Sequence, residues 1–275
     1  ALVYLPIFLF VSFIAGAKLE HIGFVLFTAV LVILLTILPV WQNSVSEEEI
    51  RFLSIISKTQ FRVLTFLVFG GVSALSVIGF LVFKKNYFYW IFYATIILSI
   101  SLALSLIAGR ILQDYQLMRL VVFLDPTIDP QGAGWNIIQS VTAVGSGGIV
   151  GKGFLSGTQS HYQFLPQQST DFIFSIIAEE WGFLGGAFVF LLFSIIFMRG
   201  VLILSQAKDN FARYVVSGIL GMIFFHFLIN IGMAMGIMPI TGIPLFFLSY
   251  GGSSLWTAAI GIGLLLNIHM KRYRM

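Results

Sequence analysis

The residues most able to do chemistry stand at the end of a long, nearly uncharged segment. Asp171 follows Ser169 and Thr170 and directly precedes an apolar run that is typical of a helix. Ser, Thr and Asp all cap helices well, and the helix dipole favours an anion at that end. The same place would keep a carboxylate ionised, as a general base or a metal ligand requires. From these residues alone, capping is the first interpretation of Asp171 and catalysis the second.

Lys152 is the only basic residue between Pro126 and Thr170, and glycines surround it. Glycine lets a ligand approach the backbone closely, and the run Gly-Ser-Gly-Gly at residues 145–148 resembles an anion-binding nest of backbone N–H groups. Flexible glycine turns explain the same run equally well. An anion site around Lys152 and a set of plain turns therefore both stay open.

Two arginines, Arg110 and Arg119, stand near the start of the same segment. The forked guanidinium group suits phosphate recognition, and a lysine serves as a point charge. An ion pair of Arg119 with Asp114 or Asp125 is an equally good explanation of its charge.

Two acids follow Asp171 inside the next apolar run. Glu179 and Glu180 are eight and nine residues further on, or about 12 Å deeper along a helix. Ionisable groups at that depth face a protein interior or a wet cavity. In a later run, His226 and Asn230 share one helical face, where we expect interhelical hydrogen bonds rather than catalysis.

The composition sets the solvent in which these residues work. Hydrophobic residues make up 59% of the 275 and charged residues only 9%, with a mean hydropathy of +1.00, whereas soluble domains carry about 25% charged residues. This excess indicates an integral membrane protein. The net charge of +4 is a weak sign of nucleic-acid binding, because basic residues between apolar runs more often fix membrane orientation. We expect no nucleic-acid partner.

Seven apolar stretches approach the roughly 20 residues that a spanning helix needs. They cover residues 2–17, 22–41, 63–83, 87–108 and 172–198, and two more lie within 214–270, divided by the Gly/Pro-containing residues 236–244. The sequence therefore predicts an all-α, polytopic membrane protein with about seven transmembrane helices. Residues 109–170 form a long connection that is too apolar to be disordered, so we expect a partly helical loop.

Lysine and arginine gather on the cytoplasmic side of membrane proteins. The C-terminal Lys-Arg-Tyr-Arg at 271–274 and the connection that holds Arg199, Lys208 and Arg213 are two crossings apart, so they share a side. Placing both in the cytoplasm puts the 109–170 loop outside the cytoplasmic (inner) membrane.

An ordered series of motifs resembles one family. Residues 161–174 read HYQFLPQQSTDFIF and residues 178–185 read AEEWGFLG. Further matches are YQLMRLVVFLDP at 115–126, GWNIIQS at 134–140, GKG at 151–153 and PITGIPLFFLSYGGSS at 239–254. The chain is identified by these motifs as a member of the SEDS family (shape, elongation, division and sporulation). FLDP and the paired glutamines resemble its RodA, cell-elongation branch.

The resemblance implies a peptidoglycan glycosyltransferase that polymerises lipid II into glycan. Its implied partners are a class B penicillin-binding protein and other membrane proteins of the elongation complex. The family's essential aspartate falls on Asp171, which could also hold Mg²⁺ or Mn²⁺. The candidates for contacts with the pyrophosphate or the sugar are Lys152, Arg119, Arg110 and Gln159, and Glu179 and Glu180 are expected to give polar support inside the membrane.

Two departures from the family pattern concern domain organisation. Family members have about ten spans, so the chain resembles the C-terminal part of a longer protein, with residues 1–275 forming one incomplete SEDS domain. Residues 63–108 resemble an inserted helix pair within it.

Two other function classes remain open beside the transferase. A lipid II flippase would use Glu179 and Glu180 to line a polar path next to discontinuous helices. A non-enzymatic scaffold would recruit cell-wall enzymes. Glycan formation from purified lipid II in detergent distinguishes the transferase from both.

Overall fold

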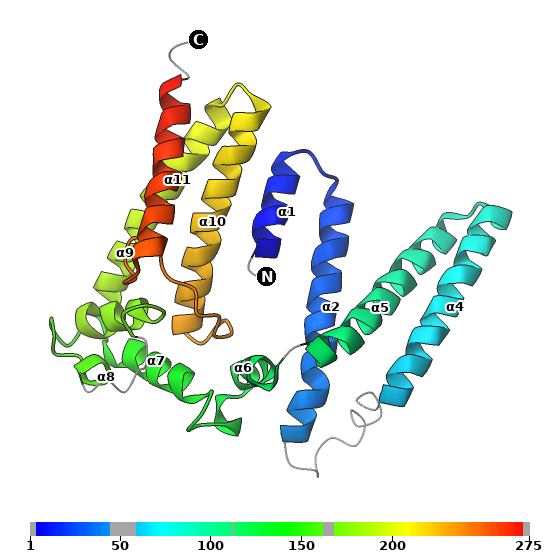
Figure 1. Cartoon of the computed structure of the whole chain (residues 1–275), viewed down its shortest axis with the longest axis horizontal. Coiled ribbons are helices and arrows are strands. Elements are labelled where there is room, and N and C mark those ends of the chain that lie inside the picture. The colour runs from blue at the N-terminus through cyan, green and yellow to red at the C-terminus, as the bar shows by residue number, and fades with distance from the viewer. Residues whose placement is uncertain (1–3, 45–58, 112, 162–167, 272–275) are drawn as a thin grey trace. The chain divides into compact units, whose positions relative to one another are not determined.

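Figure 1 shows the computed structural model of the chain, which describes residues 4–44, 59–111, 113–161 and 168–271. Within these ranges the regular elements are all helices. The chain divides into two compact units, one formed by Lys18–Ile128 and the other by Ala1–Ala17 with Asp129–Met275. Each unit is described by itself below.

The unit Lys18–Ile128 is built on a pair of long antiparallel apolar helices beside a third. Its elements are α2 (Leu19–Ser44), α4 (Thr59–Phe83), α5 (Asn86–Ile111), α6 (Asp114–Leu124) and the 3-10 helix η1 (Pro126–Ile128). Ser73 of α4 donates a hydrogen bond to Thr95 of α5 over 2.8 Å. Buried hydroxyl pairs of this kind join helices where the surroundings offer no water.

The second unit contains the other helices and the predicted site. Its elements are α1 (Tyr4–Ile14), α7 (Trp135–Ser146), α8 (Thr158–His161), α9 (Ile173–Gln206), α10 (Asn210–Ala234) and α11 (Gly252–Lys271). Phenylalanines form the core between α9 and α10, where the rings of Phe193 and Phe227 lie 4.6 Å apart. Such aromatic contacts add to the packing that holds membrane helices together.

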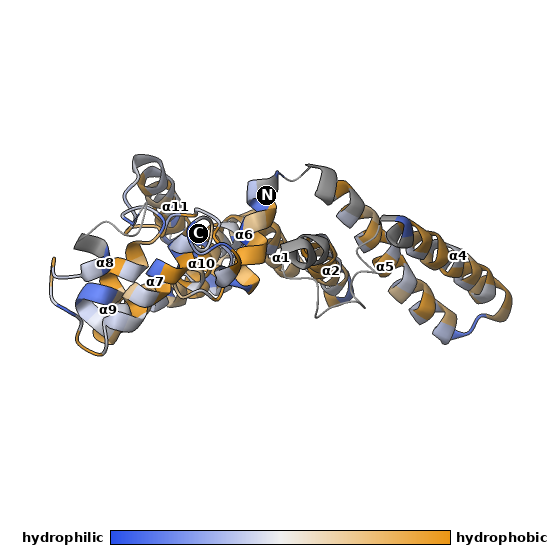
Figure 2. Cartoon of the chain, turned by 90° about the horizontal axis from the view of Figure 1, so that it is seen from below, coloured by the Kyte–Doolittle hydropathy of each residue, from blue (hydrophilic) through white to orange (hydrophobic). Residues whose placement is uncertain are grey.

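The predicted polytopic, all-α architecture is confirmed. Six helices in the described ranges are long and apolar enough to cross a bilayer, and Figure 2 shows hydrophobic residues along the helices of both units. The first predicted stretch, residues 2–17, contains an 11-residue helix, α1, which is shorter than the roughly 20 residues of a full crossing. The predicted break after the sixth stretch is confirmed, since α10 ends at Ala234 and α11 begins at Gly252.

The described part of the long connection is partly helical, as predicted. It contains α6, η1, α7 and α8, although residues 112 and 162–167, which include much of the HYQFLPQQSTDFIF motif, lie outside the described ranges. The division between the two units falls within it, after Ile128.

Helix α9 is interrupted at Gly182, where φ is +64° and ψ is −158°. The glycine-rich segment that follows α7 fills the interruption. The amides of Phe183 and Leu184 donate to the carbonyls of Gly148 and Ile149 over 2.9 and 3.2 Å. The bilayer core contains no water that could bond free backbone N–H and C=O groups. This pairing supplies the missing partners, so the helix can be interrupted inside an apolar bundle.

The same segment satisfies the other side of the break. The amides of Lys152 and Gly153 donate to the carbonyls of Glu179 and Glu180 over 3.0 and 2.9 Å. A Cβ atom on Gly182 would lie 2.6 Å from the carbonyl oxygen of Ile149, so glycine is needed here for both its backbone angles and its size.

Candidate functional site

Asp171 lies in a turn immediately before α9 and is partly exposed. The cap position of α9 is occupied by Phe172, the helix begins at Ile173, and no side chain of the cap residue bonds the helix. Asp171 therefore lies one residue before the cap position that the sequence indicated for it. Its closeness to the positive end of the helix dipole is as expected.

The backbone around Asp171 is fixed by partners from α10 and from the connection between α10 and α11. The side-chain Nδ2 of Asn230 donates to the carbonyl oxygens of Asp171 and Ile243, both over 2.7 Å. The amide of Tyr250 donates to the carbonyl of Ser169 over 2.9 Å. The side chain of Asn230 is fully buried, so these bonds are shielded from water on the Asn230 side and hold the start of α9 against residues 243–250.

The Asp171 carboxylate faces a glycine of that connection. A Cβ atom on Gly242 would lie 3.3 Å from Oδ2 of Asp171, and Gly242 has a φ of +68°. Glycine at this position therefore supplies a backbone conformation that other residues rarely adopt and leaves space beside the carboxylate. We call Asp171, Asn230, Gly242 and Ile243 the aspartate site.

A second polar group lies further along α9. Glu179 has no exposed side-chain surface and forms a 2.9 Å salt bridge with Lys152. Its Oε1 also accepts hydrogen bonds from the hydroxyl of Thr158 over 3.0 Å and from the amide of Gln159 over 2.9 Å. A buried carboxylate is costly unless it is paired and hydrogen-bonded, and these partners meet that requirement. We call Lys152, Thr158, Gln159 and Glu179 the glutamate cluster.

The glutamate cluster shows which groups the Lys152 side chain and the backbone near it bind. Two of the three Lys152 ammonium donors are engaged, with Glu179 and with the Thr158 hydroxyl over 2.8 Å, and its side chain is 26% exposed. Lys152 thus retains one N–H for a ligand, while its charge is largely balanced by Glu179. The segment after α7 directs the amides of Lys152 and Gly153 to α9 carbonyls, so these two N–H groups are unavailable to an anion.

Of the two predicted acids inside α9, Glu179 binds residues of the preceding connection through its Oε1. Glu180 is 8% exposed, and its carbonyl belongs to the pairing at the break. Gln159 joins the glutamate cluster through its backbone, and its side-chain Oε1 is buried with no hydrogen-bond partner among the described residues.

The arginine candidates belong to the unit Lys18–Ile128. The side chain of Arg110 lies outside the part of the chain that the structure describes. Arg119 is exposed, with its guanidinium carbon 5.6 Å from the centre of the Tyr115 ring. Asp125 accepts hydrogen bonds from the hydroxyl and the amide of Thr127 over 2.6 and 2.9 Å. These bonds lower the pKa of Asp125, and no Arg119–Asp125 ion pair occurs among the described residues.

The shared face of His226 and Asn230 has two separate uses. Asn230 bonds other segments, as predicted. His226 does not, because its Nδ1 bonds the carbonyl of Met222 within α10 and its ring stacks on Phe246 at 4.3 Å.

Sequence reasoning also missed a buried pair of hydroxyls, Ser140 and Ser175, 2.6 Å apart, that joins α7 to α9. Serines inside apolar helices are the only sequence signal for such a contact.

The residues around Asp171 offer few ligands for a metal ion. The described residues contain no group of three His, Cys, Asp or Glu side chains that could hold one. Within the described ranges, the buried Oδ1 of Asn230 has no hydrogen-bond partner, and an amide oxygen is an acceptor of the kind that a hard cation uses. One carboxylate and one amide oxygen fit only an ion that takes its other ligands from water or substrate, as Mg²⁺ often does.

The aspartate site presents a carboxylate beside a glycine, on a backbone that Asn230 fixes. Geometry of this kind meets the first requirement of a general base, which is a defined position.

Comparison with known proteins places these features in a family. A family model for FtsW, RodA and SpoVE, described as "Cell cycle protein", matches residues 69–274. The chain is 50% identical over 272 residues to the peptidoglycan glycosyltransferase RodA of Treponema pallidum (strain Nichols), covering 99% of this chain and 63% of the relative. It is 45% identical over 162 residues to the peptidoglycan glycosyltransferase MrdB of Escherichia coli (strain K12), covering 59% of this chain and 44% of the relative.

Among solved structures, the chain is similar to one from a study of the coordination of polymerization and crosslinking by a peptidoglycan synthase complex. The TM-score is 0.52 and the identity 30%, over 88% of this chain and 69% of the other. The chain spans less than two thirds of the length of either curated relative described above.

Proposed function

The chain belongs to the FtsW/RodA/SpoVE family, and from this premise we propose that it carries the catalytic aspartate of a peptidoglycan glycosyltransferase that polymerises lipid II during cell elongation. The names of the two relatives support the activity. The observation that carries the proposal is the aspartate site, in which Asn230 fixes the backbone of Asp171 and the residue next to its carboxylate is Gly242, which has no side chain.

The proposed reaction joins the 4-hydroxyl of one sugar to the anomeric carbon of another. Asp171 takes the hydroxyl proton, the new C–O bond forms, and the bond from the anomeric carbon to the lipid pyrophosphate breaks. The backbone bonds of Asn230 matter here because a base acts efficiently only from a defined position. The proton then passes from Asp171 to solvent, which the partial exposure of this residue allows.

The leaving pyrophosphate needs positive charge. Lys152 can offer one N–H in addition to its bonds with Glu179 and Thr158, and Gln159 is a further candidate for contacts with pyrophosphate or sugar. The same role for Arg119 and Arg110 rests on the sequence alone, because they belong to the unit Lys18–Ile128. A Mg²⁺ or Mn²⁺ ion held by Asp171, with Asn230 as a second ligand, would supply Lewis-acid stabilisation of the pyrophosphate.

The flippase alternative is weaker than the transferase. It requires acids that line a polar path beside discontinuous helices. Glu179 is fully buried and neutralised by Lys152, and the break in α9 is filled by backbone pairs. Both features favour a fixed support over a path for a polar head group.

We further propose that residues 109–170 lie on the outer face of the cytoplasmic membrane and that the C-terminus lies in the cytoplasm. The positive-inside rule supports this orientation, and lipid II polymerisation on the outer face requires it. We propose a class B penicillin-binding protein as a partner, supported by the likeness to a chain of a peptidoglycan synthase complex. Co-purification of the full-length protein with such a partner tests this, and an active protein that never associates with one would contradict it.

The activity itself is tested with the full-length protein and purified lipid II in detergent. A transferase forms glycan without two compartments, so polymer should appear on a gel when the protein is added. Its absence, together with lipid II transport in vesicles, would replace the transferase by the flippase. A protein that does neither but still binds cell-wall enzymes would be a scaffold.

A further inference from the structure

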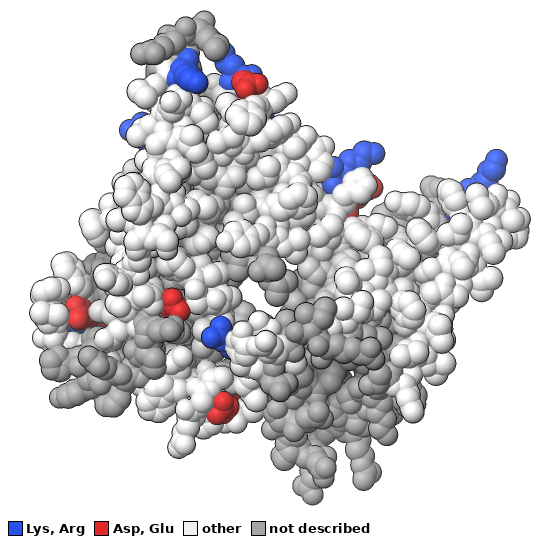
Figure 3. All heavy atoms as spheres, viewed as in Figure 1, with Lys and Arg blue, Asp and Glu red and all other residues white. Residues whose placement is uncertain are grey.

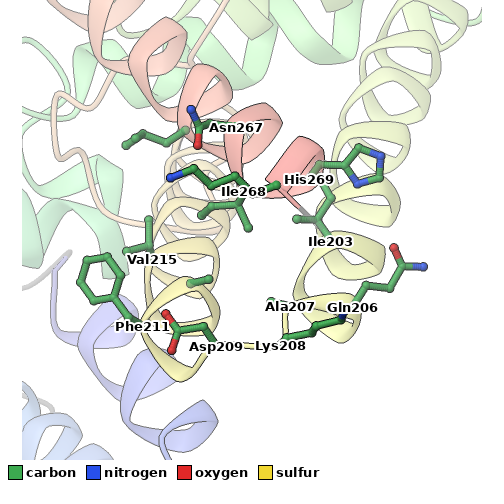
Figure 4. A pocket seen from close by; sticks show the side chains of 13 residues that line it. Ile203, Gln206, Ala207, Lys208, Asp209, Phe211, Val215, Asn267, Ile268 and His269 are labelled. Carbon is green, nitrogen blue, oxygen red and sulfur yellow. The ribbon is translucent and has the colours of Figure 1, made fainter. Parts of the chain in front are cut away.

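A cavity of about 520 Å³ lies between the ends of three helices. Asp171 precedes the opposite end of α9, and Asn230 lies near the opposite end of α10. The last turns of α9, the first turns of α10 and the last turns of α11 form its walls, and Figure 4 shows side chains from all three around it. Each of these elements belongs to the same compact unit.

Basic residues gather around this cavity. Lys208 and Lys271 line it, Arg213 lies one turn along α10 from the lining residue Asp209, and Asp209 is the only acid among its lining residues. Figure 3 shows lysine or arginine atoms beside an acid at the end of the unit near the C-terminus. Gln206 and Asn267 add amide donors to the lining. The rim therefore suits an anionic group.

Deeper in the cavity the lining is apolar on each helix. Ile203 lies five residues before Lys208, Val215 six after Asp209, and Leu264 seven before Lys271. At 1.5 Å of rise per residue, the change from polar rim to apolar wall takes about 8–10 Å along the helices. A phospholipid makes the same change from its phosphate to its first acyl carbons. The lining of the cavity thus changes from polar to apolar along the helix axes.

We propose that this cavity binds an anionic phospholipid, with the phosphate near Lys208 and Lys271 and the acyl chains along Ile203, Val215 and Leu264. The volume is within the range of small-molecule sites. A lipid satisfies both parts of the lining, whereas a free anion leaves the apolar wall exposed. The lipid would link the ends of α9, α10 and α11 and so steady the helices that carry the aspartate site at their other ends.

Native mass spectrometry of the full-length protein in detergent tests the proposal. The protein is titrated with phosphatidylglycerol and, separately, with phosphatidylcholine of the same acyl chains. Phosphatidylglycerol should bind more tightly. The double variant Lys208→Gln, Lys271→Gln should weaken its binding by roughly 10-fold or more, since each basic residue near a lipid head group contributes on the order of a factor of five.

Three further variants separate a site from general surface charge. Lys84→Gln with Lys85→Gln removes the same charge from the turn between α4 and α5 and should change binding by less than about 2-fold. Asp209→Asn removes the only acid of the lining and should strengthen binding several-fold. Ala212→Leu adds volume to the lining without changing charge and should weaken binding.

The proposal fails if phosphatidylcholine binds as well as phosphatidylglycerol, or if the Lys84, Lys85 variant loses as much binding as the cavity variant. It also fails if glycerol phosphate displaces the lipid at equal concentration, because that result identifies an anion site with no role for the apolar wall. None of these outcomes depends on glycan synthesis.

Discussion

The ammonium nitrogen of Lys152 lies 2.9 Å from Oε1 of Glu179, whose side chain has no exposed surface. This pair ties the connection after α7 to the first half of α9, directly before the interruption at Gly182. Lys152 and Glu179 are 27 residues apart in the sequence. The positive charge of Lys152 compensates the cost of burying the Glu179 carboxylate.

Lys152→Ala should lower both thermal stability and glycan synthesis while membrane insertion stays normal. It leaves the buried Glu179 carboxylate without its counter-charge, and breaking a buried pair costs about 3–5 kcal/mol; the partial exposure of Lys152 reduces this to about 2–3 kcal/mol. Thermal shift in detergent and lipid II polymerisation measure the two effects. Adding Glu179→Gln to Lys152→Ala should restore much of the stability, and a double variant no more stable than the single one would refute the pairing argument.

Asp171→Asn should lower the rate of glycan synthesis by at least about 100-fold. The melting temperature should stay within about 2 °C of that of the parent protein. The amide has the shape of the carboxylate, and the Asp171 carbonyl that Asn230 binds is unchanged, but the amide cannot accept the hydroxyl proton. Polymer formation from lipid II and a thermal shift are compared on one preparation. Normal polymerisation would reject Asp171 as the base, and loss of folding would make its role structural.

Asn230→Ala should reduce glycan synthesis and stability together. It removes the donor from two carbonyls, those of Asp171 and Ile243, and each buried acceptor left unsatisfied costs about 1–3 kcal/mol. Ser194→Ala, which removes an exposed hydroxyl bonded within α9, serves as the control and should behave as the parent. An Asn230→Ala protein with full activity would show that the Asp171 backbone needs no such support.

Gly182→Ala should prevent stable folding of the second unit. The new methyl group meets the Ile149 carbonyl at 2.6 Å, and φ at this position is +64°, so both sterics and backbone strain oppose it. Gly186→Ala is the matched control on the same helix, because its nearest neighbour is 3.5 Å away. The yield of monodisperse protein after size-exclusion chromatography measures the effect. Equal yields for the two variants would contradict the close docking at the break.

A reporter fused after Met275 or inserted near Lys208 should read as cytoplasmic, and one near Ser156 as external. The clustering of basic residues at the ends of α9, α10 and α11 is the physical basis. Alkaline phosphatase and fluorescent-protein fusions to the full-length protein give opposite signals for the two sides. A cytoplasmic Ser156 would overturn both the orientation and the proposed reaction at the outer face.

The sequence by itself determined the class of protein and most of the spans, and it singled out Asp171 as the predicted catalytic residue. Runs of about 20 apolar residues with few charges leave little choice in lipid, since each backbone group must bond within its own helix. The break between α10 and α11 was predictable for a different reason, because clustered glycine and proline residues interrupt helices. The match of motifs around Asp171 gave its role through family likeness.

Tertiary structure alone decided how Asp171 and Lys152 are held. The backbone carbonyl of Asp171 is bonded by Asn230, 59 residues away, and Lys152 forms its salt bridge with Glu179. Hydrogen bonds and ion pairs between distant residues depend on how the helices pack, and the order of residues along one chain does not encode that packing directly. For this reason the sequence left an anion site and plain turns equally open for the glycines, whereas the fold uses the segment that follows α7 to fill a broken helix.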